Sequence, residues 1–312
     1  MIICNHRDAW GYGAVDPSSG TAIMMEVARV LGQKVKQGWR PRRSIVFASW
    51  AAEEAGIMGS AEWVYDKVHK LVNRAVGLVN IDAPIQGPIL LAYASPTLTG
   101  VFLNAIKGIP STADERKTYF QFLEDFYRRD NSSTKKSVKE NIKLLGSGTD
   151  HASFAFYAGV PATYQKFKID KLKYPGVSGY PTYHTGFETF HLVDKIIDPG
   201  FVASRASTQI SLHIILQLSE SPVIPYSLQE MTRVLEKEIK KDIFTTLRDI
   251  GLADSLDVMV EAFQKFKSAV SQWEKETEQL KTDGFKDKLR SLFPILTTTS
   301  LSYSDCDIIS SG

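Results

Sequence analysis

The sequence lacks the features that mark several large classes of protein. Only two of its 312 residues are cysteines, Cys4 and Cys306, and they lie at opposite ends. This excludes a disulfide framework and a cysteine-based metal site. No run reaches the roughly 18 apolar residues that a membrane-spanning helix needs. Lys and Arg number 37 against 35 Asp and Glu, so the charge gives no reason to expect nucleic acid as a partner.

The residues that are present have an ordinary globular balance, with 43% apolar and 23% charged residues. Their pattern divides the chain into three parts. Residues 1–220 alternate between helical and strand patterns, and residues 221–290 are helical in pattern, without proline from 226 to 290. Serine and threonine dominate the start of residues 291–312, and we expect a disordered tail there.

A mostly parallel sheet flanked by helices is predicted for the first part. Residues 44–50 and 75–81 are compact apolar runs that suit buried strands, and residues 58–71 between them have helical character. Strand, helix and strand with short joints indicate a βαβ unit. Another helix is expected before Gly38, because Ile23, Val27, Val30 and Leu31 fall on one helical face.

Residues 111–145 are polar and charged, and we interpret them as a surface excursion. Asn131 begins an N-glycosylation triplet within it, which has meaning only if the protein is secreted. Residues 226–290 predict an antiparallel helical pair, with an apolar stripe at Met259, Phe263, Phe266 and Val270.

Acidic residues and histidines gather where the strands of the sheet are expected to end. Glu53 and Glu54 follow one predicted strand and Asp82 follows the next, at the edge where open α/β sheets bind ligands. His6 and Asp16 precede the first helix, and Tyr183-His184 lies late in the α/β part. Taken singly, each could be a helix cap or a solvated polar residue. Adjacent Glu53 and Glu54, however, repel each other unless a cation or a proton lies between them.

Two histidines with several carboxylates suit zinc, which takes nitrogen and oxygen ligands at about 2 Å. A bridging carboxylate would let two metal ions sit about 3.5–4 Å apart, lower the pKa of a shared water and polarise a carbonyl. One further carboxylate must then take the proton and pass it to the leaving amine. The sequence therefore indicates metal-assisted hydrolysis of an amide.

Five segments stand out in order along the chain: residues 5–10 (NHRDAW), 13–20 (GAVDPSSG), 39–43 (WRPRR), 47–56 (FASWAAEEAG) and 180–184 (YPTYH). Together they resemble the glutamate carboxypeptidase II family of dizinc peptidases, also called N-acetylated alpha-linked acidic dipeptidases, and its dipeptidase-like branch in particular. The resemblance runs from about residue 4 to 285. It implies a partial zinc-peptidase α/β sandwich over residues 1–220, a truncated dimerisation-like helical domain over 221–290, and two Zn²⁺ per chain.

The same resemblance implies a role for each matching residue. Asp16 would bridge the two zinc ions, with His6 and Asp82 on one ion and Glu54 and His184 on the other. Glu53 would be the general base. The hydroxyl of Tyr183 would stabilise the developing oxyanion. Substrate would be bound by Gly148 and Thr149 of a pocket loop, and by Lys166.

Departures from the family pattern limit what the resemblance implies about substrate. Glutamate-cleaving members carry two arginines shortly after the pocket loop, whereas residues 162–168 contain none. Lys166 or Lys168 supplies a point charge but not the bidentate fork of arginine. The substrate is therefore expected to be a short peptide, with no preference for an acidic residue implied.

The family also has a membrane anchor, earlier strands and an apical domain ahead of the His6 motif. This chain is thus expected to be a C-terminal fragment. The resemblance implies the outer face of the plasma membrane, reached only through that missing anchor, and a homodimer formed through the helical region.

Two alternatives to an active exopeptidase stay open. The chain could be a catalytically inert truncated isoform, or a receptor-like binding protein of the same fold, as the transferrin receptor is. Retention of all six residues from His6 to His184 argues against a receptor that has lost its ligands. A serine hydrolase is disfavoured, because no Gly-x-Ser-x-Gly elbow follows a strand.

Overall fold

A computed structural model describes residues 1–131, 133–177, 179–238, 244–250 and 253–282. The chain divides into two compact units, Met1–Glu230 and Met231–Gly312. The first unit contains the sheet and all the residues that the sequence analysis assigned to a site. The predicted tail at residues 291–312 lies outside the described residues.

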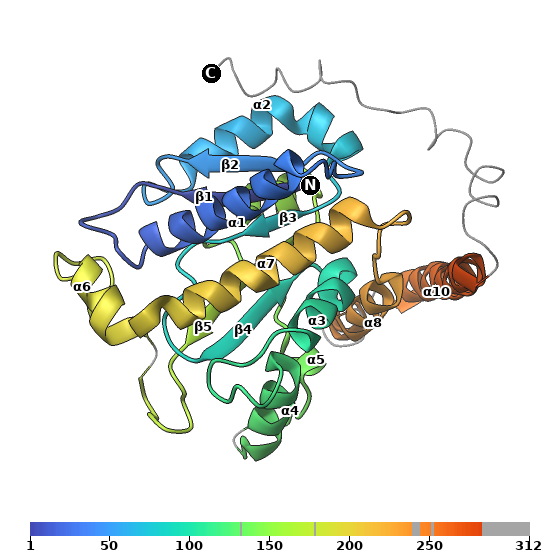
Figure 1. The fold of residues 1–312 in the computed structure, drawn as a ribbon. Coiled ribbons are helices and arrows are strands. Elements are labelled where there is room, and N and C mark those ends of the chain that lie inside the picture. Colours follow the sequence, from blue (N-terminus) through green and yellow to red (C-terminus); the bar gives the residue numbers. More distant parts are fainter. Residues whose placement is uncertain (132, 178, 239–243, 251–252, 283–312) are drawn as a thin grey trace. The chain divides into compact units, whose positions relative to one another are not determined.

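The first unit is built on a five-stranded sheet with the strand order β2-β1-β3-β5-β4 (Figure 1). Strands β2, β1, β3 and β5 are parallel, and β4 pairs antiparallel with β5 at one edge. The strands are β1 (Ile2–His6), β2 (Val46–Trp50), β3 (Leu78–Asn80), β4 (Ile89–Ala94) and β5 (Ala162–Lys168). The predicted fold class, a mostly parallel sheet flanked by helices, is confirmed.

Each face of the sheet is covered by helices, because successive side chains of a strand point to opposite faces. Ile3 of β1 enters one core, while Ile2 and Cys4 enter the other. Helices α1 (Ser18–Lys36), α3 (Thr99–Lys107) and α7 (Val202–Glu220) cover the first face, and α1 and α7 lie across it in Figure 1. Helix α2 (Met58–Arg74) and the helical turn η2 (Ser153–Tyr157) cover the second face.

Helix α1 approaches the sheet closely at Gly20. A Cβ atom at this position would lie 2.0 Å from the carbonyl oxygen of Asp82, so a larger side chain would push the helix away. The start of α1 is thereby fixed against the end of β3. This contact places the loop before α1, with Asp16, beside Asp82.

The core beneath α3 and α7 gives a test of the fold. Phe102 of α3 is fully buried there. We expect Phe102→Ala to lower the free energy of unfolding by about 3–5 kcal/mol, because a large cavity replaces the ring. Urea unfolding measures this change. Phe190→Ala, at a ring that is 68% exposed, is the control and should change the free energy of unfolding by less than about 1 kcal/mol.

Residues 111–145 are more ordered than the surface excursion that their polarity predicted. Helix α4 (Tyr119–Arg129) begins with a capping box between Thr118 and Gln121 and buries one face. The buried side chains recur at helical spacing: Tyr119, Leu123, Phe126 and Tyr127. A second capping box, between Ser137 and Glu140, starts the short helix α5 (Val138–Asn141). The apolar stripe of α4 was obscured by the charged residues on its outer face.

Short helical segments complete the first unit: η1 (Pro96–Leu98), α6 (Phe190–Leu192), η3 (Val193–Ile197) and η4 (Pro199–Phe201). In the described part of residues 226–290, the predicted helical character is present in α8 (Leu228–Glu238), α9 (Phe244–Asp249) and α10 (Ala253–Thr282). On the predicted stripe of α10, Val270 is buried, whereas Phe266 is 40% exposed. None of the helices described here combines the length and the apolar character needed to cross a bilayer.

Candidate active site

The six residues predicted to bind and use metal come from four separate places in the fold. His6 ends β1, and Asp82 follows β3. Glu53 and Glu54 lie in the loop after β2. Asp16 precedes α1, and His184 lies in an irregular segment after β5. Because β1, β2 and β3 are parallel neighbours, their carboxyl ends meet at one edge of the sheet.

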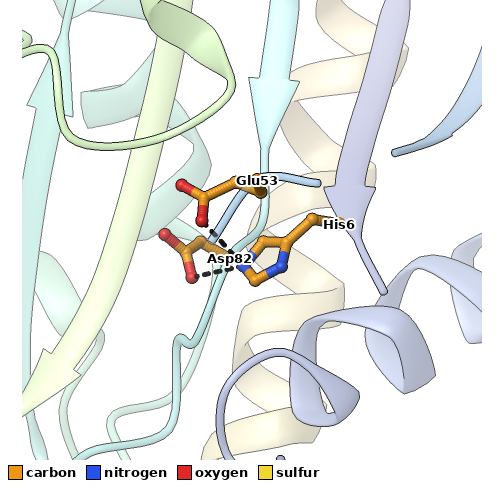
Figure 2. A group of neighbouring side chains, drawn as sticks. All are labelled: His6, Glu53 and Asp82. Carbon is orange, nitrogen blue, oxygen red and sulfur yellow. Dashed lines mark hydrogen bonds and ion pairs between the residues drawn. The ribbon is translucent and has the colours of Figure 1, made fainter. Parts of the chain in front are cut away.

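His6 lies at the centre of the first half of the site. Its Nε2 atom is 3.4 Å from Oδ1 of Asp82 and 3.9 Å from Oε2 of Glu53, and Figure 2 shows both carboxylates facing the ring. The same Nε2 lies 3.3 Å from Oδ1 of Asp16. His6 is buried, so these charges interact with little screening by solvent.

Asp16 joins the two halves of the site. While its Oδ1 faces His6, its Oδ2 lies 3.4 Å from Nε2 of His184. His184 Nε2 is in turn 3.1 Å from Oε2 of Glu54. A carboxylate that offers one oxygen to each of two histidines has the arrangement of a bridging ligand.

Several donor atoms of the predicted ligands lack a hydrogen-bond partner in the part of the chain that the structure describes, as is expected of atoms that bind a metal ion. Oδ1 of Asp16, Oε1 of Glu54 and Nε2 of His184 are buried and make no hydrogen bond with the described residues. Buried polar atoms are otherwise almost always hydrogen-bonded. Imidazole nitrogens and carboxylate oxygens in this number suit Zn²⁺, and neither half of the site offers the oxygen-only shell that Ca²⁺ prefers.

Two groups of three side chains are close enough to hold one ion each: His6 with Glu53 and Asp82, and His6 with Asp16 and Glu54. The groups contain four of the five predicted ligands, His6, Asp16, Glu54 and Asp82, but not His184. They also include Glu53, for which the resemblance implies the role of base. The ligand and base roles of the six residues stay predictions.

Burial and charge shift the proton affinities of the site. Burial raises the pKa of Glu53 to about 8, and the nearby carboxylates of Asp82 and Asp150 add to the rise, while His6 opposes it. Burial lowers the pKa of His6, but the adjacent carboxylates of Asp16 and Asp82 outweigh it and raise the value to about 11. Without metal, a proton on His6 therefore balances the carboxylates. Metal binding must displace that proton, which makes metal affinity depend on pH.

A cavity of about 590 Å³ opens beside these ligands. Asp16, Asp82 and Tyr183 line one part of it, and the loop with Gly148 and Thr149 lines another. Lys166 also lines the cavity, with its ammonium 5.1 Å from the centre of the Tyr164 ring. The structure thus brings four of the five predicted catalytic and substrate-binding residues to the wall of one cavity: Tyr183, Gly148, Thr149 and Lys166. The fifth, Glu53, is not among the residues that line it.

Two carboxylates that hold the ligands in place received no role in the sequence analysis. Asp8 accepts hydrogen bonds from the backbone N–H groups of Glu53 and Glu54, at 3.2 and 3.1 Å. Glu188, which is buried, accepts from the N–H groups of Asp16 and His184. Asp8 has a visible signal, since it lies two residues after His6. Glu188 has only its position four residues after His184, which by itself predicts nothing.

Asp150 is a further buried carboxyl group close to the site. Burial raises its pKa from 3.8 to about 6, while a hydrogen bond from Ser60 opposes the rise. Its folded-state pKa therefore exceeds the unfolded value, so the stabilising contribution of the bound proton is complete below about pH 4 and is lost as the pH rises through about 6.

We expect Asp150→Asn to remove the loss of stability that ionisation of Asp150 causes as the pH rises. In metal-free protein, the free energy of unfolding of the variant relative to the parent should rise by about 3 kcal/mol between pH 4 and pH 7. Urea unfolding at several pH values measures it. A difference that stays constant with pH would contradict the raised pKa of Asp150.

Comparison with known proteins agrees with the resemblance. Aminopeptidase NAALADL1 of Rattus norvegicus is 36% identical over 276 residues, which cover 87% of this chain and 36% of that protein. The probable glutamate carboxypeptidase LAMP1 of Arabidopsis thaliana is 31% identical over 283 residues, 90% of this chain and 38% of that protein. The chain thus spans little more than a third of the length of these curated relatives.

Among solved structures, a zinc aminopeptidase from Bacillus subtilis aligns with a TM-score of 0.46 and 19% identity, over 70% of this chain and 46% of that one. The family model of peptidase family M28 matches residues 1–197. These residues include all the predicted ligands and the cavity loop. The chain belongs to peptidase family M28.

Proposed function

We propose that this chain is a zinc-dependent exopeptidase that hydrolyses short peptides, with two zinc ions per chain and Glu53 as general base. The observation that carries the proposal is Asp16, whose two carboxylate oxygens face His6 and His184 at 3.3 and 3.4 Å. Membership of a peptidase family supports the reaction class. Bound zinc would lower the pKa of a water molecule and polarise the scissile carbonyl group.

Glu53 is suited to move the proton in this reaction. Its carboxylate faces His6 and Asp82 from the loop after β2 (Figure 2), and burial raises its pKa to about 8. This rise belongs to the protein without metal. The charge of bound zinc would lower the pKa of Glu53 again, so that its carboxylate could accept a proton at physiological pH and return it. In the proposed mechanism Glu53 takes the proton of the attacking water and then delivers it to the departing nitrogen.

Tyr183 is suited to stabilise negative charge on the carbonyl oxygen. Its ring stacks on His184 with 3.7 Å between the centroids, and its side chain borders the cavity. Burial and the neighbouring carboxylates, first Asp16, raise the pKa of the Tyr183 hydroxyl, which keeps it protonated as a donor. A donor that is already in place when charge develops lowers the barrier.

The cavity sets the size of the substrate. A volume of about 590 Å³ accommodates a small peptide rather than a folded chain. The loop with Gly148 and Thr149 and the ammonium of Lys166 would bind the polar groups of that peptide. Burial lowers the pKa of Lys166, while the charges of Asp82 and Asp16 oppose this effect.

The test is hydrolysis of a dipeptide series with free, N-acetylated and C-amidated ends, followed by chromatography and mass spectrometry. We expect release of free amino acids that stops on chelation and returns with zinc. The blocked series also identifies which end of the peptide must be free. A zinc-loaded chain that releases nothing would refute the proposal and favour the alternative, an inert or receptor-like protein of the same fold.

A further inference from the structure

The loop that carries Glu53 and Glu54 is held in a strained conformation. Ala52 and Ile57 have φ angles of 57° and 62°, in the left-handed region that residues with a side chain rarely adopt. Each such residue costs about 1–2 kcal/mol and keeps its conformation only where neighbouring contacts enforce it. Asp8 provides one such contact, through the N–H groups of Glu53 and Glu54.

A second contact holds the other end of the loop. Ser60, in the first turn of α2, donates a hydrogen bond of 2.6 Å from its hydroxyl to Oδ1 of Asp150. Both residues are fully buried. At Gly59 a Cβ atom would lie 2.2 Å from the carbonyl oxygen of Ala51, so the start of α2 presses directly against the loop. A displacement of Ser60 is therefore passed on to the loop.

Asp150 is itself anchored by its neighbours. Asn80 at the end of β3 donates to the Thr149 hydroxyl at 2.9 Å and to Nδ1 of His151 at 3.3 Å. Since Nδ1 of His151 accepts, its Nε2 carries the proton and donates to the carbonyl of Gly146 at 2.7 Å. Asn80, Thr149 and His151 are buried, and Asn80 precedes Asp82 by two residues.

We infer that Asp150 is a positioning residue: through Ser60 it holds residues 51–57, and with them Glu53, against the loop 146–151 that lines the cavity. Among the described residues, Asp150 does not line the cavity and makes no hydrogen bond with a predicted ligand. Its effect on turnover rests on the proposed function, whereas its effect on the loop does not.

The experiment compares the full chain with Asp150→Ala, Ser60→Ala, the double variant and Asp150→Asn. We expect each alanine variant to lower kcat about 10–100-fold with KM changed less than about twofold, because loss of a supporting contact typically has this effect. The kcat of the double variant should be no lower than that of either single variant, since each single substitution already removes the same hydrogen bond between Ser60 and Asp150. Asp150→Asn keeps an acceptor oxygen and should restore kcat to within about threefold of the parent.

Hydrogen exchange supplies a readout that does not depend on activity. Amides of residues 52–57 should exchange about tenfold faster in the alanine variants than in the parent, because the loop opens more easily. The matched control is Asp198→Ala, which removes another buried carboxylate bonded to a serine, Ser204, at 2.7 Å near the start of α7. That variant should be destabilised without faster exchange in residues 52–57 and without a lower kcat.

Parental kcat and parental exchange of residues 52–57 in both Asp150→Ala and Ser60→Ala would overturn the inference. Additive losses in the double variant would overturn it as well. If Asp150→Ala fails to fold, Ser60→Ala alone carries the comparison. A parent that releases no amino acid, together with faster loop exchange in the variants, would refute the proposed function but support the positioning of the loop by Asp150.

Discussion

Replacing Glu53 with glutamine should reduce kcat for peptide hydrolysis by about 10²–10⁴-fold. Glutamine has nearly the same size and keeps the hydrogen-bonding shape of the side chain, but it cannot accept and return a proton. Asp8 binds the backbone N–H of residue 53, not its side chain, so the loop should keep its position. Steady-state hydrolysis of a dipeptide, with zinc content measured on the same samples, gives the result.

The matched control for this variant is Glu62→Gln, at an exposed position on α2. It removes the same charge from the same helix-and-loop region and should leave kcat and zinc content unchanged. Two results would show that Glu53 is not the base: parental turnover in Glu53→Gln, or a loss of activity that follows a loss of zinc. The second result would place Glu53 among the ligands, as its proximity to His6 and Asp82 allows.

Asp16→Asn should have the largest effect on metal content. An amide offers one neutral oxygen instead of two charged ones, so it cannot bridge His6 and His184. We expect the zinc content to fall from about two ions per chain to fewer than about one, and turnover to be lost with it. Elemental analysis after dialysis against a defined low zinc concentration measures the content.

The control is Asp66→Asn, because the Asp66 side chain is 70% exposed on α2 and forms its ion pair with Lys67, remote from the predicted ligands in sequence. It should bind zinc as the parent does. Full zinc content in Asp16→Asn would show that the ions, if two are bound, are held independently of this carboxylate. The bridging role of Asp16 would then be wrong.

The parts of the fold that the sequence predicted are those with a local pattern. The helix before Gly38 is visible because its apolar residues recur at helical spacing, and the strand that ends at Trp50 because it is a compact apolar run; the structure has them as α1 and β2. Strand β1, which lies between β2 and β3, was not predicted, since five residues at the start of the chain give too short a pattern. The antiparallel edge strand β4 was missed because its partner β5 lies about 70 residues away in sequence, beyond any local signal.

The site could be predicted from the sequence only in part. The rule that ligands gather at the carboxyl ends of parallel strands places Glu53, Glu54 and Asp82 at one edge. His184 has no strand to position it, and its place followed from the resemblance alone. Asp150 and Glu188 were missed because their importance comes from burial and long-range hydrogen bonds. Location at the plasma membrane and pairing into a homodimer stay predictions.

The most direct test of the two-metal site is anomalous diffraction at the zinc absorption edge from crystals of the zinc-loaded chain. We predict two peaks on either side of the Asp16 carboxylate, one within about 2 Å of His6 Nε2 and the other within about 2 Å of His184 Nε2. A single peak, or peaks remote from Asp16, would contradict the account.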